Sequence, residues 1–78
     1  MIQNVIVQVV ALGEQVLLEG YALAGAEVRI AETDEEVRKV WAEIPGQSSI
    51  VLLTQRAARA LGPLLADPDS PPTIELPK

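Results

Sequence analysis

Four short runs of strand-forming residues alternate with segments of helical character along this 78-residue chain. The runs cover residues 5–10, 28–30, 49–53 and 73–76, and the first and third are apolar at odd and even positions alike. Such runs are typical of strands that are buried on both faces, as in parallel sheets covered by helices. Strands that are separated by helices pair in parallel through right-handed crossovers. The order β-α-β-α-β-α-β therefore predicts an α/β fold built on one parallel sheet.

The first expected helix covers residues 16–24 and ends at Gly25, a residue type that commonly follows a helix. It contains Gly20, which costs about 1 kcal/mol of helix propensity relative to alanine. We interpret this glycine as a point where the helix packs closely against the sheet. The third expected helix starts after an N-cap at Thr54. It breaks or kinks near Pro63, because proline lacks a backbone N–H.

The second expected helix has the strongest local signals. Thr33 and Glu36 have the spacing of a capping box, and the acidic residues beside them suit the positive end of the helix dipole better than they suit a metal site. The apolar face repeats at i, i+3, i+4 and i+7, and it consists of Val37, Val40, Trp41 and Ile44. Trp41 is therefore interpreted as a residue of the core or its edge. Two i, i+4 ion pairs are expected on the outer face, Asp34 with Arg38 and Glu35 with Lys39.

These elements predict a single domain over residues 1–78: a small doubly wound sheet, flavodoxin-like or Rossmann-like, with four parallel strands in the order 2-1-3-4 and three helices. In this order the first helix covers one face of the sheet, and the second and third helices cover the other. The first face then has no cover over the third and fourth strands. Because side chains alternate along a strand, part of the following set must form an exposed apolar patch, which marks an interaction surface: Ile50, Val51, Leu52, Leu53 and Ile74.

Composition excludes most catalytic chemistry. The chain contains no His and no Cys, so a nucleophile–His pair, an iron–sulfur cluster or a Cys-ligated zinc site cannot be assembled from it. Six Lys and Arg against eleven Asp and Glu give a net charge of −5, which disfavours nucleic acids and anionic membrane surfaces as partners. The chain has neither the basic start of a signal peptide nor the roughly 20 apolar residues of a membrane span. We therefore expect a cytoplasmic protein without catalytic activity, cofactor or metal.

Ligands of open parallel sheets bind at the carboxyl ends of the strands, near the point where the strand order reverses. Gly13 follows the first strand there, as a phosphate-binding loop would. The sequence around it lacks the further glycines and the lysine of such loops, and Glu14 would repel a phosphate, so an ordinary turn explains Gly13 better. The acidic pair and the aspartate of a response-regulator receiver are also missing from this edge.

Two arginines on the third helix are candidates for a binding role at the same edge. Arg56 and Arg59 lie one turn apart and could bind an anion or a partner's carboxylate, although a solvated helix face is the commoner explanation. Tyr21, on the first helix, suits an interface nearly as well as the core. A partner interface at this edge would comprise Leu12, Gly13, Glu14, Tyr21, Thr54, Gln55, Arg56 and Arg59.

Three parts of the sequence resemble the F-subunit family of the V-type and archaeal A-type rotary ATPases. Residues 20–25 (Gly-Tyr-Ala-Leu-Ala-Gly) are similar to the Gly-Phe-x-Leu-Ala-Gly that ends the family's first helix. Residues 31–36 (Ala-Glu-Thr-Asp-Glu-Glu) resemble the start of its second helix. Residues 50–55 (Ile-Val-Leu-Leu-Thr-Gln) and 72–77 (Pro-Thr-Ile-Glu-Leu-Pro) are similar to its third strand and to its closing strand. These parts occur in the family's order along the chain.

The resemblance implies a non-catalytic protein on the central stalk of a proton- or sodium-translocating ATPase, where it would contact the rotor and modulate coupling. The fold that it implies is the same four-stranded α/β sheet. The chain departs from the family at residues 14–17, where Glu-Gln-Val-Leu replaces Asp-x-Asp-Thr-like residues. The family's C-terminal helix also has no counterpart before Lys78. Two alternatives stay open: a homodimeric regulatory domain of another assembly, and a small-ligand-binding domain that uses the Gly13/Thr54 edge.

Overall fold

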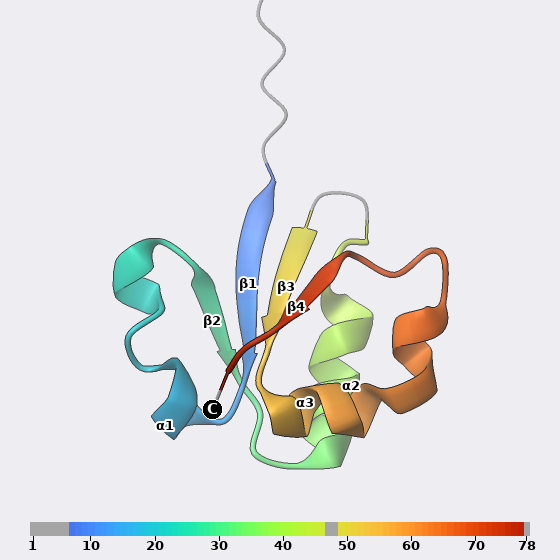
Figure 1. Cartoon of the computed structure of the whole chain (residues 1–78), viewed down its shortest axis with the longest axis horizontal. Coiled ribbons are helices and arrows are strands. Elements are labelled where there is room, and N and C mark those ends of the chain that lie inside the picture. Colours follow the sequence, from blue (N-terminus) through green and yellow to red (C-terminus); the bar gives the residue numbers. More distant parts are fainter. Residues whose placement is uncertain (1–6, 47–48, 78) are drawn as a thin grey trace, which may run out of the picture.

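A computed structural model describes residues 7–46 and 49–77 of the chain. Within these residues a four-stranded sheet has the order β2-β1-β3-β4, and every pair of neighbouring strands is parallel (Figure 1). The strands are β1 (Gln8–Gly13), β2 (Glu27–Ile30), β3 (Ser49–Leu53) and β4 (Thr73–Glu75). The described helices are α1 (Gln15–Leu18), α2 (Asp34–Glu43) and α3 (Gln55–Leu61), with 3-10 turns η1 (Ala22–Ala24) and η2 (Gly62–Ala66). The predicted doubly wound, flavodoxin-like α/β fold is confirmed.

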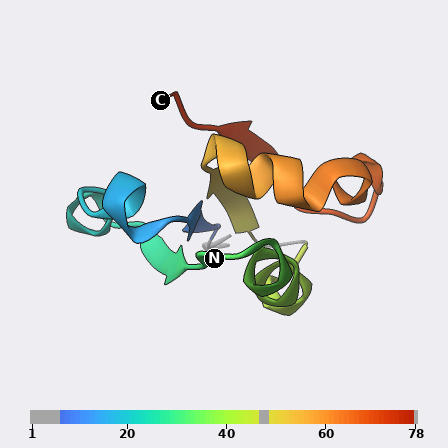
Figure 2. The ribbon, with the colours of Figure 1, turned by 90° about the horizontal axis from the view of Figure 1, so that it is seen from below.

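The helices divide between the two faces of the sheet as the strand order requires. Seen along the strands, α1 and η1 lie on one side of the sheet, and α2 and α3 lie on the other (Figure 2). The main hydrophobic core fills the space between the sheet and the α2/α3 layer. Its buried members are Val10, Leu12, Ala31, Val37, Ile44, Val51, Leu53, Ala57 and Leu61. On the opposite side, Leu18 of α1 is buried and holds this short helix against β1 and β2.

The first strand ends later than predicted. The described part of β1 runs from Gln8 to Gly13, whereas the sequence prediction placed the strand at residues 5–10, of which 5 and 6 lie outside the described residues. The strand continues because both neighbours pair with its second half: Leu12 is in register with Arg29 of β2 and with Leu53 of β3. Tertiary pairing therefore overrides the local turn signal at Gly13.

The first helix was predicted as one continuous element, and that prediction is wrong. The α-helical part ends at Leu18, residues 19–21 form a turn, and η1 follows. Gly20 is exposed, and a Cβ built on it would meet no atom within 4 Å, so the interpretation of close packing against the sheet is also wrong. The glycine instead lies where the helix breaks, in keeping with its low helix propensity. Gly25 caps η1 as predicted, with a φ of 95° and its N–H donated to the Ala22 carbonyl.

The second helix confirms its local signals. The Thr33 hydroxyl accepts a hydrogen bond from the Glu36 N–H at 3.1 Å, and the Glu36 carboxylate accepts one from the Thr33 N–H at 3.3 Å. Trp41 is half-buried against the main core, as expected for its edge.

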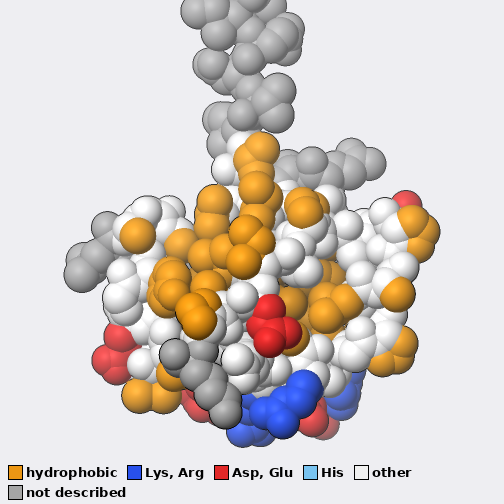
Figure 3. Space-filling view, in the orientation of Figure 1, with side chains coloured by type: hydrophobic (Ala, Val, Ile, Leu, Met, Phe, Trp, Pro, Cys, Tyr) orange, Lys and Arg blue, Asp and Glu red, His pale blue; other side chains and the backbone are white. Residues whose placement is uncertain are grey.

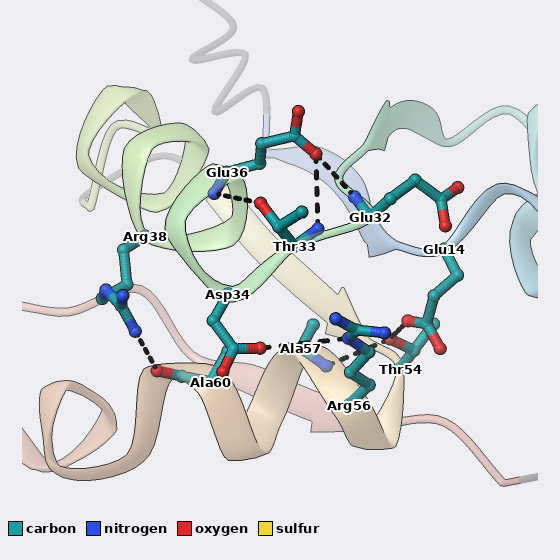
Figure 4. Close-up of polar contacts among 10 residues, drawn as sticks. All are labelled: Glu14, Glu32, Thr33, Asp34, Glu36, Arg38, Thr54, Arg56, Ala57 and Ala60. Atoms are coloured by element: carbon teal, nitrogen blue, oxygen red, sulfur yellow. Dashed lines mark hydrogen bonds and ion pairs between the residues drawn. The ribbon is translucent and has the colours of Figure 1, made fainter.

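The predicted ion pairs along α2 are not among the ion pairs of the described residues. Asp34 instead faces Arg56 of α3 at 3.9 Å, and Arg38 donates to the Ala60 carbonyl at 3.4 Å (Figure 4). Because α2 packs beside α3, these side chains find partners across the helix pair rather than one turn along α2.

The third helix ends near the proline, as predicted. It stops at Leu61, and Pro63 falls inside η2. Among the described residues, no helix is long and apolar enough to cross a membrane.

Candidate functional site

The ends of β1 and β3 bring the predicted edge residues together. The Thr54 N–H donates to the Leu12 carbonyl at 3.2 Å, and the Ala31 N–H donates to the Gly13 carbonyl at 2.9 Å. The end of β1 is thus fixed between the residues that follow β3 and β2. This is the carboxyl edge of the sheet, at the point where the strand order reverses.

Thr54 organises this edge. Its hydroxyl oxygen accepts a hydrogen bond from the Ala57 N–H at 3.2 Å and donates its proton to Glu14 at 2.5 Å (Figure 4). The first contact caps α3, as predicted, and the second ties the residue after β1 to the residue after β3. Thr54 is only 1% exposed, and its side chain covers Gly13. Gly13 and Leu12 are therefore buried beneath the edge.

A pocket of about 380 Å³ opens at this edge. We call it the edge pocket, and its lining residues are Glu14, Leu17, Tyr21, Thr54, Gln55, Arg56, Arg59, Leu76 and Pro77. Six of the eight residues predicted for an interface line it, while Leu12 and Gly13 do not.

Sequence reasoning missed three lining residues, Leu17, Leu76 and Pro77. The predicted strand order contained a signal for the last two, because the carboxyl end of a strand beside β3 must reach the same edge. The structure shows this directly, since the Leu76 N–H donates to the Leu53 carbonyl at 2.7 Å. Leu17 had no such signal, because its position depends on where the short α1 packs.

The edge pocket combines an apolar wall with two cations. Arg56 and Arg59 stand one turn apart on α3 and both line the pocket. The contact of Arg56 with Asp34, at 3.9 Å, joins two side chains that are about half exposed, so it contributes little to stability. The Glu14 carboxylate also lines the pocket, and it accepts a hydrogen bond from the Thr54 hydroxyl. In Figure 3, Lys and Arg side chains gather at the lower margin of the view, at the end of the molecule where the strands finish.

The acidic residues near α2 have structural partners. The Glu32 carboxylate accepts the Gln15 N–H at 3.0 Å, which ties the start of α1 to the chain after β2. Glu36 accepts the N–H groups of Glu32 and Thr33, at 2.9 and 3.3 Å. The contacts of Glu36 support the interpretation of this residue as a cap of α2, while Glu32 binds a free N–H group at the start of α1.

The second feature is an apolar sheet surface. The strand register pairs Val9 with Ile50 and Leu52 with Ile74, so these four side chains share the face on which α1 lies. We call them the open face; the alternate residues of β3 belong to the main core instead. Val9 is 37% and Ile74 is 56% exposed, while Ile50 and Leu52 are half-buried. Figure 3 shows hydrophobic side chains gathered over β1 and beside it on this side. Among the described residues, no helix covers β3 and β4 on this side of the sheet, as predicted.

The edge strand beside the open face is poorly suited to pairing with another strand. β4 has three residues, with Pro72 directly before it and Pro77 two residues after it. Prolines at a sheet edge supply no N–H group and thereby hinder the addition of a further strand. On the β4 side, the face of the sheet is therefore better suited to a partner than the strand edge is.

The fold and these two surfaces define a small flavodoxin-like domain with an edge pocket and an uncovered apolar face. No protein-family model matches the chain, and no curated protein matches it either. The relationship to the F-subunit family of the rotary ATPases stays a prediction that rests on the sequence resemblance.

Proposed function

We propose that this protein is a non-catalytic interaction module that docks onto a partner protein through its open face. The observation that carries the proposal is the exposure of Val9, near the start of β1, and of Ile74 on β4, on the face where α1 lies against β1 and β2 only. Burial of apolar surface contributes about 25 cal/mol per Å², from which the costs of association are subtracted. A protein partner fits this surface better than an anionic membrane does, because the chain carries a net charge of −5.

The particular partner that we propose is the central stalk of a V-type or A-type rotary ATPase on its cytoplasmic side. Support comes from the positions of the resembling stretches. Residues 50–55 contain Ile50 and Leu52 of the open face, and residues 72–77 contain Ile74. The part of the chain that is similar to the F-subunit family is thus the part that provides most of the proposed docking surface.

The experiment is reconstitution with the stalk proteins of a rotary ATPase from the same source. We expect the chain to co-purify with them and the variant Ile74→Glu to be lost from the complex, because a charge would be buried in the interface. Leu64→Glu is the matched control. Leu64 is 43% exposed on η2, away from the sheet, and its substitution should leave the complex intact.

Two outcomes would contradict this proposal in different ways. If neither the chain nor its variants join the stalk, the rotary ATPase assignment is wrong. If sedimentation of the chain alone shows a dimer that Ile74→Glu dissociates, the partner is a second copy and the homodimeric alternative replaces the stalk.

A further inference from the structure

We propose that the edge pocket binds a carboxylate that is joined to an apolar group. Arg56 and Arg59 would hold the carboxylate, and Leu17, Tyr21 and Leu76 would pack against the apolar group. This binding site is separate from the open face, so the proposal does not depend on the docking partner.

The position and size of the pocket suit a ligand. It lies outside the carboxyl ends of β1 and β3, where the chain crosses to β2 on one side and to β4 on the other. Open parallel sheets bind ligands at such points. A volume of about 380 Å³ lies within the usual range of small-ligand pockets, roughly 300–1,000 Å³.

The charges of the pocket match a single carboxylate. Among the lining residues, two guanidinium groups and the Glu14 carboxylate leave one net positive charge. Asp34, outside the lining, faces Arg56 at 3.9 Å, so a bound carboxylate would compete with Asp34 for Arg56 and would meet no such competitor at Arg59 among the ion pairs of the described residues. Guanidinium groups bind carboxylates through two parallel N–H···O bonds. Among the ion pairs of residues 7–46 and 49–77, Arg59 takes part in none, and Arg56 has only its long, exposed contact with Asp34. A ligand with several phosphate groups would add more negative charge than the pocket can balance beside Glu14.

The apolar wall argues against a simple inorganic anion. Leu17 is exposed, and Leu76 and Tyr21 are half-buried, so all three still offer apolar surface to a ligand. These side chains come from the two sides of the pocket, since Leu17 and Tyr21 belong to the α1 region and Leu76 follows β4. An apolar group that entered between them would be removed from water on both sides.

A carboxylate beside an apolar group can come from a free organic acid or from the end of a polypeptide. We therefore test both sources on the full chain by titration, followed in amide NMR spectra. The probes are phenylacetate, a short peptide with a C-terminal leucine carboxylate, and the amide of each. We expect saturable shifts of the Leu17, Gln55 and Arg59 signals with the carboxylates and not with the amides. Tighter binding of the peptide would assign a polypeptide ligand, and equal or tighter binding of phenylacetate would assign a free acid.

Variants distinguish specific binding in the pocket from a general attraction of anions to positive charge. Arg59→Gln should weaken binding about tenfold or more, because it removes a charge-assisted hydrogen bond. Arg38→Gln removes the same charge from α2, outside the pocket, and should change the affinity less than about twofold. Leu17→Ser should weaken the binding of phenylacetate more than it weakens the binding of acetate, a carboxylate without an apolar ring that serves as a further probe. The proposal is overturned if neither carboxylate gives saturable shifts, if the amides bind equally well, or if Arg59→Gln binds as the wild type does.

Discussion

At the scale of single residues, Thr54 is the side chain on which the edge depends. It caps α3 through the Ala57 N–H, donates its hydroxyl to Glu14, and covers Gly13. Each role was visible in the sequence only in part: the cap followed from its place before a helix, while the contacts with Glu14 and Gly13 needed the pairing of β1 with β3. Two predictions test this arrangement.

Replacing Gly13 with alanine should destabilise the protein. The new Cβ would overlap Oγ1 and Cγ2 of Thr54, whose side chain is buried and held by two hydrogen bonds. We expect a loss of about 1–3 kcal/mol, as for overpacked cores, measured by urea denaturation. Gly20→Ala is the matched control, because its Cβ meets nothing within 4 Å and should leave stability equal or raised. Equal stabilities of the two variants would contradict the packing of Thr54 over Gly13.

Thr54→Val should remove the hydroxyl while keeping the shape of the side chain. The Ala57 N–H and the Glu14 carboxylate would lose their partner at the buried edge, so we expect a loss of about 1–3 kcal/mol in denaturation experiments. Thr54→Ser keeps the hydroxyl and should retain most of the stability. If the serine variant is as unstable as the valine variant, the methyl group and not the hydrogen bonds holds the edge.

At the scale of elements, α2 and α1 differ in where their stability comes from. α2 carries a complete capping box and a repeated apolar face, so its start was predictable from local sequence alone. α1 has four residues, no cap from the side chain of its N-cap residue Glu14, and a glycine two residues beyond its end. A helix that short is not stable by itself and persists only where tertiary packing holds it, here through buried Leu18. Its extent therefore could not be read from propensity.

The capping box gives a prediction at this scale. Thr33→Ala removes the acceptor of the Glu36 N–H and should cost about 1 kcal/mol of stability, while Thr33→Ser should cost little. Thermal unfolding followed by circular dichroism would measure both variants. An alanine variant as stable as the serine variant would show that the cap contributes nothing in this context.

At the scale of the whole molecule, the two faces of the sheet differ in how completely helices cover them. One face is closed by α2 and α3 over the buried main core, and the other is closed only in part by α1. Alternation along β3 divides neighbouring residues between them: Leu53 is 1% exposed in the core, and Leu52 is half-buried on the open face. The described part of the chain therefore retains apolar surface that its helices do not cover.

The contrast between the faces is measurable as stability. Leu53→Ala should cost about 2–5 kcal/mol, because it leaves a cavity in the core. Ile74→Ala, on the open face, should cost about 0.5 kcal/mol or less, since its side chain is already largely in water. Ile74→Ser should also lower the binding of a hydrophobic dye to the folded protein. Equal losses of stability from Leu53→Ala and Ile74→Ala would mean that the open face is covered in solution.

Most of the fold and part of the candidate site could be predicted from the sequence. Strand β3, the capping box at Thr33 and the cap at Thr54 follow from local patterns, and the predicted order 2-1-3-4 with the handedness of crossovers gives the division of the helices between the two faces. The late end of β1 and the pairing of Asp34 with Arg56 did not follow, because each depends on a neighbour that is distant in sequence. The break in α1 was missed for a different reason: the low helix propensity of Gly20 was a local signal, and we interpreted this glycine as a packing contact instead.

The sequence by itself determined the order of strands and helices along the chain and, for the strand order 2-1-3-4, how many helices each side of the sheet receives. These properties depend on residues within one or two turns of each other and on a connection rule that holds for all right-handed crossovers. Only the tertiary structure decided that Leu17, Arg59 and Leu76 line one pocket and that Thr54 covers Gly13. Those contacts join segments that are far apart along the chain, and their geometry exists only after the sheet has brought the ends of its strands together.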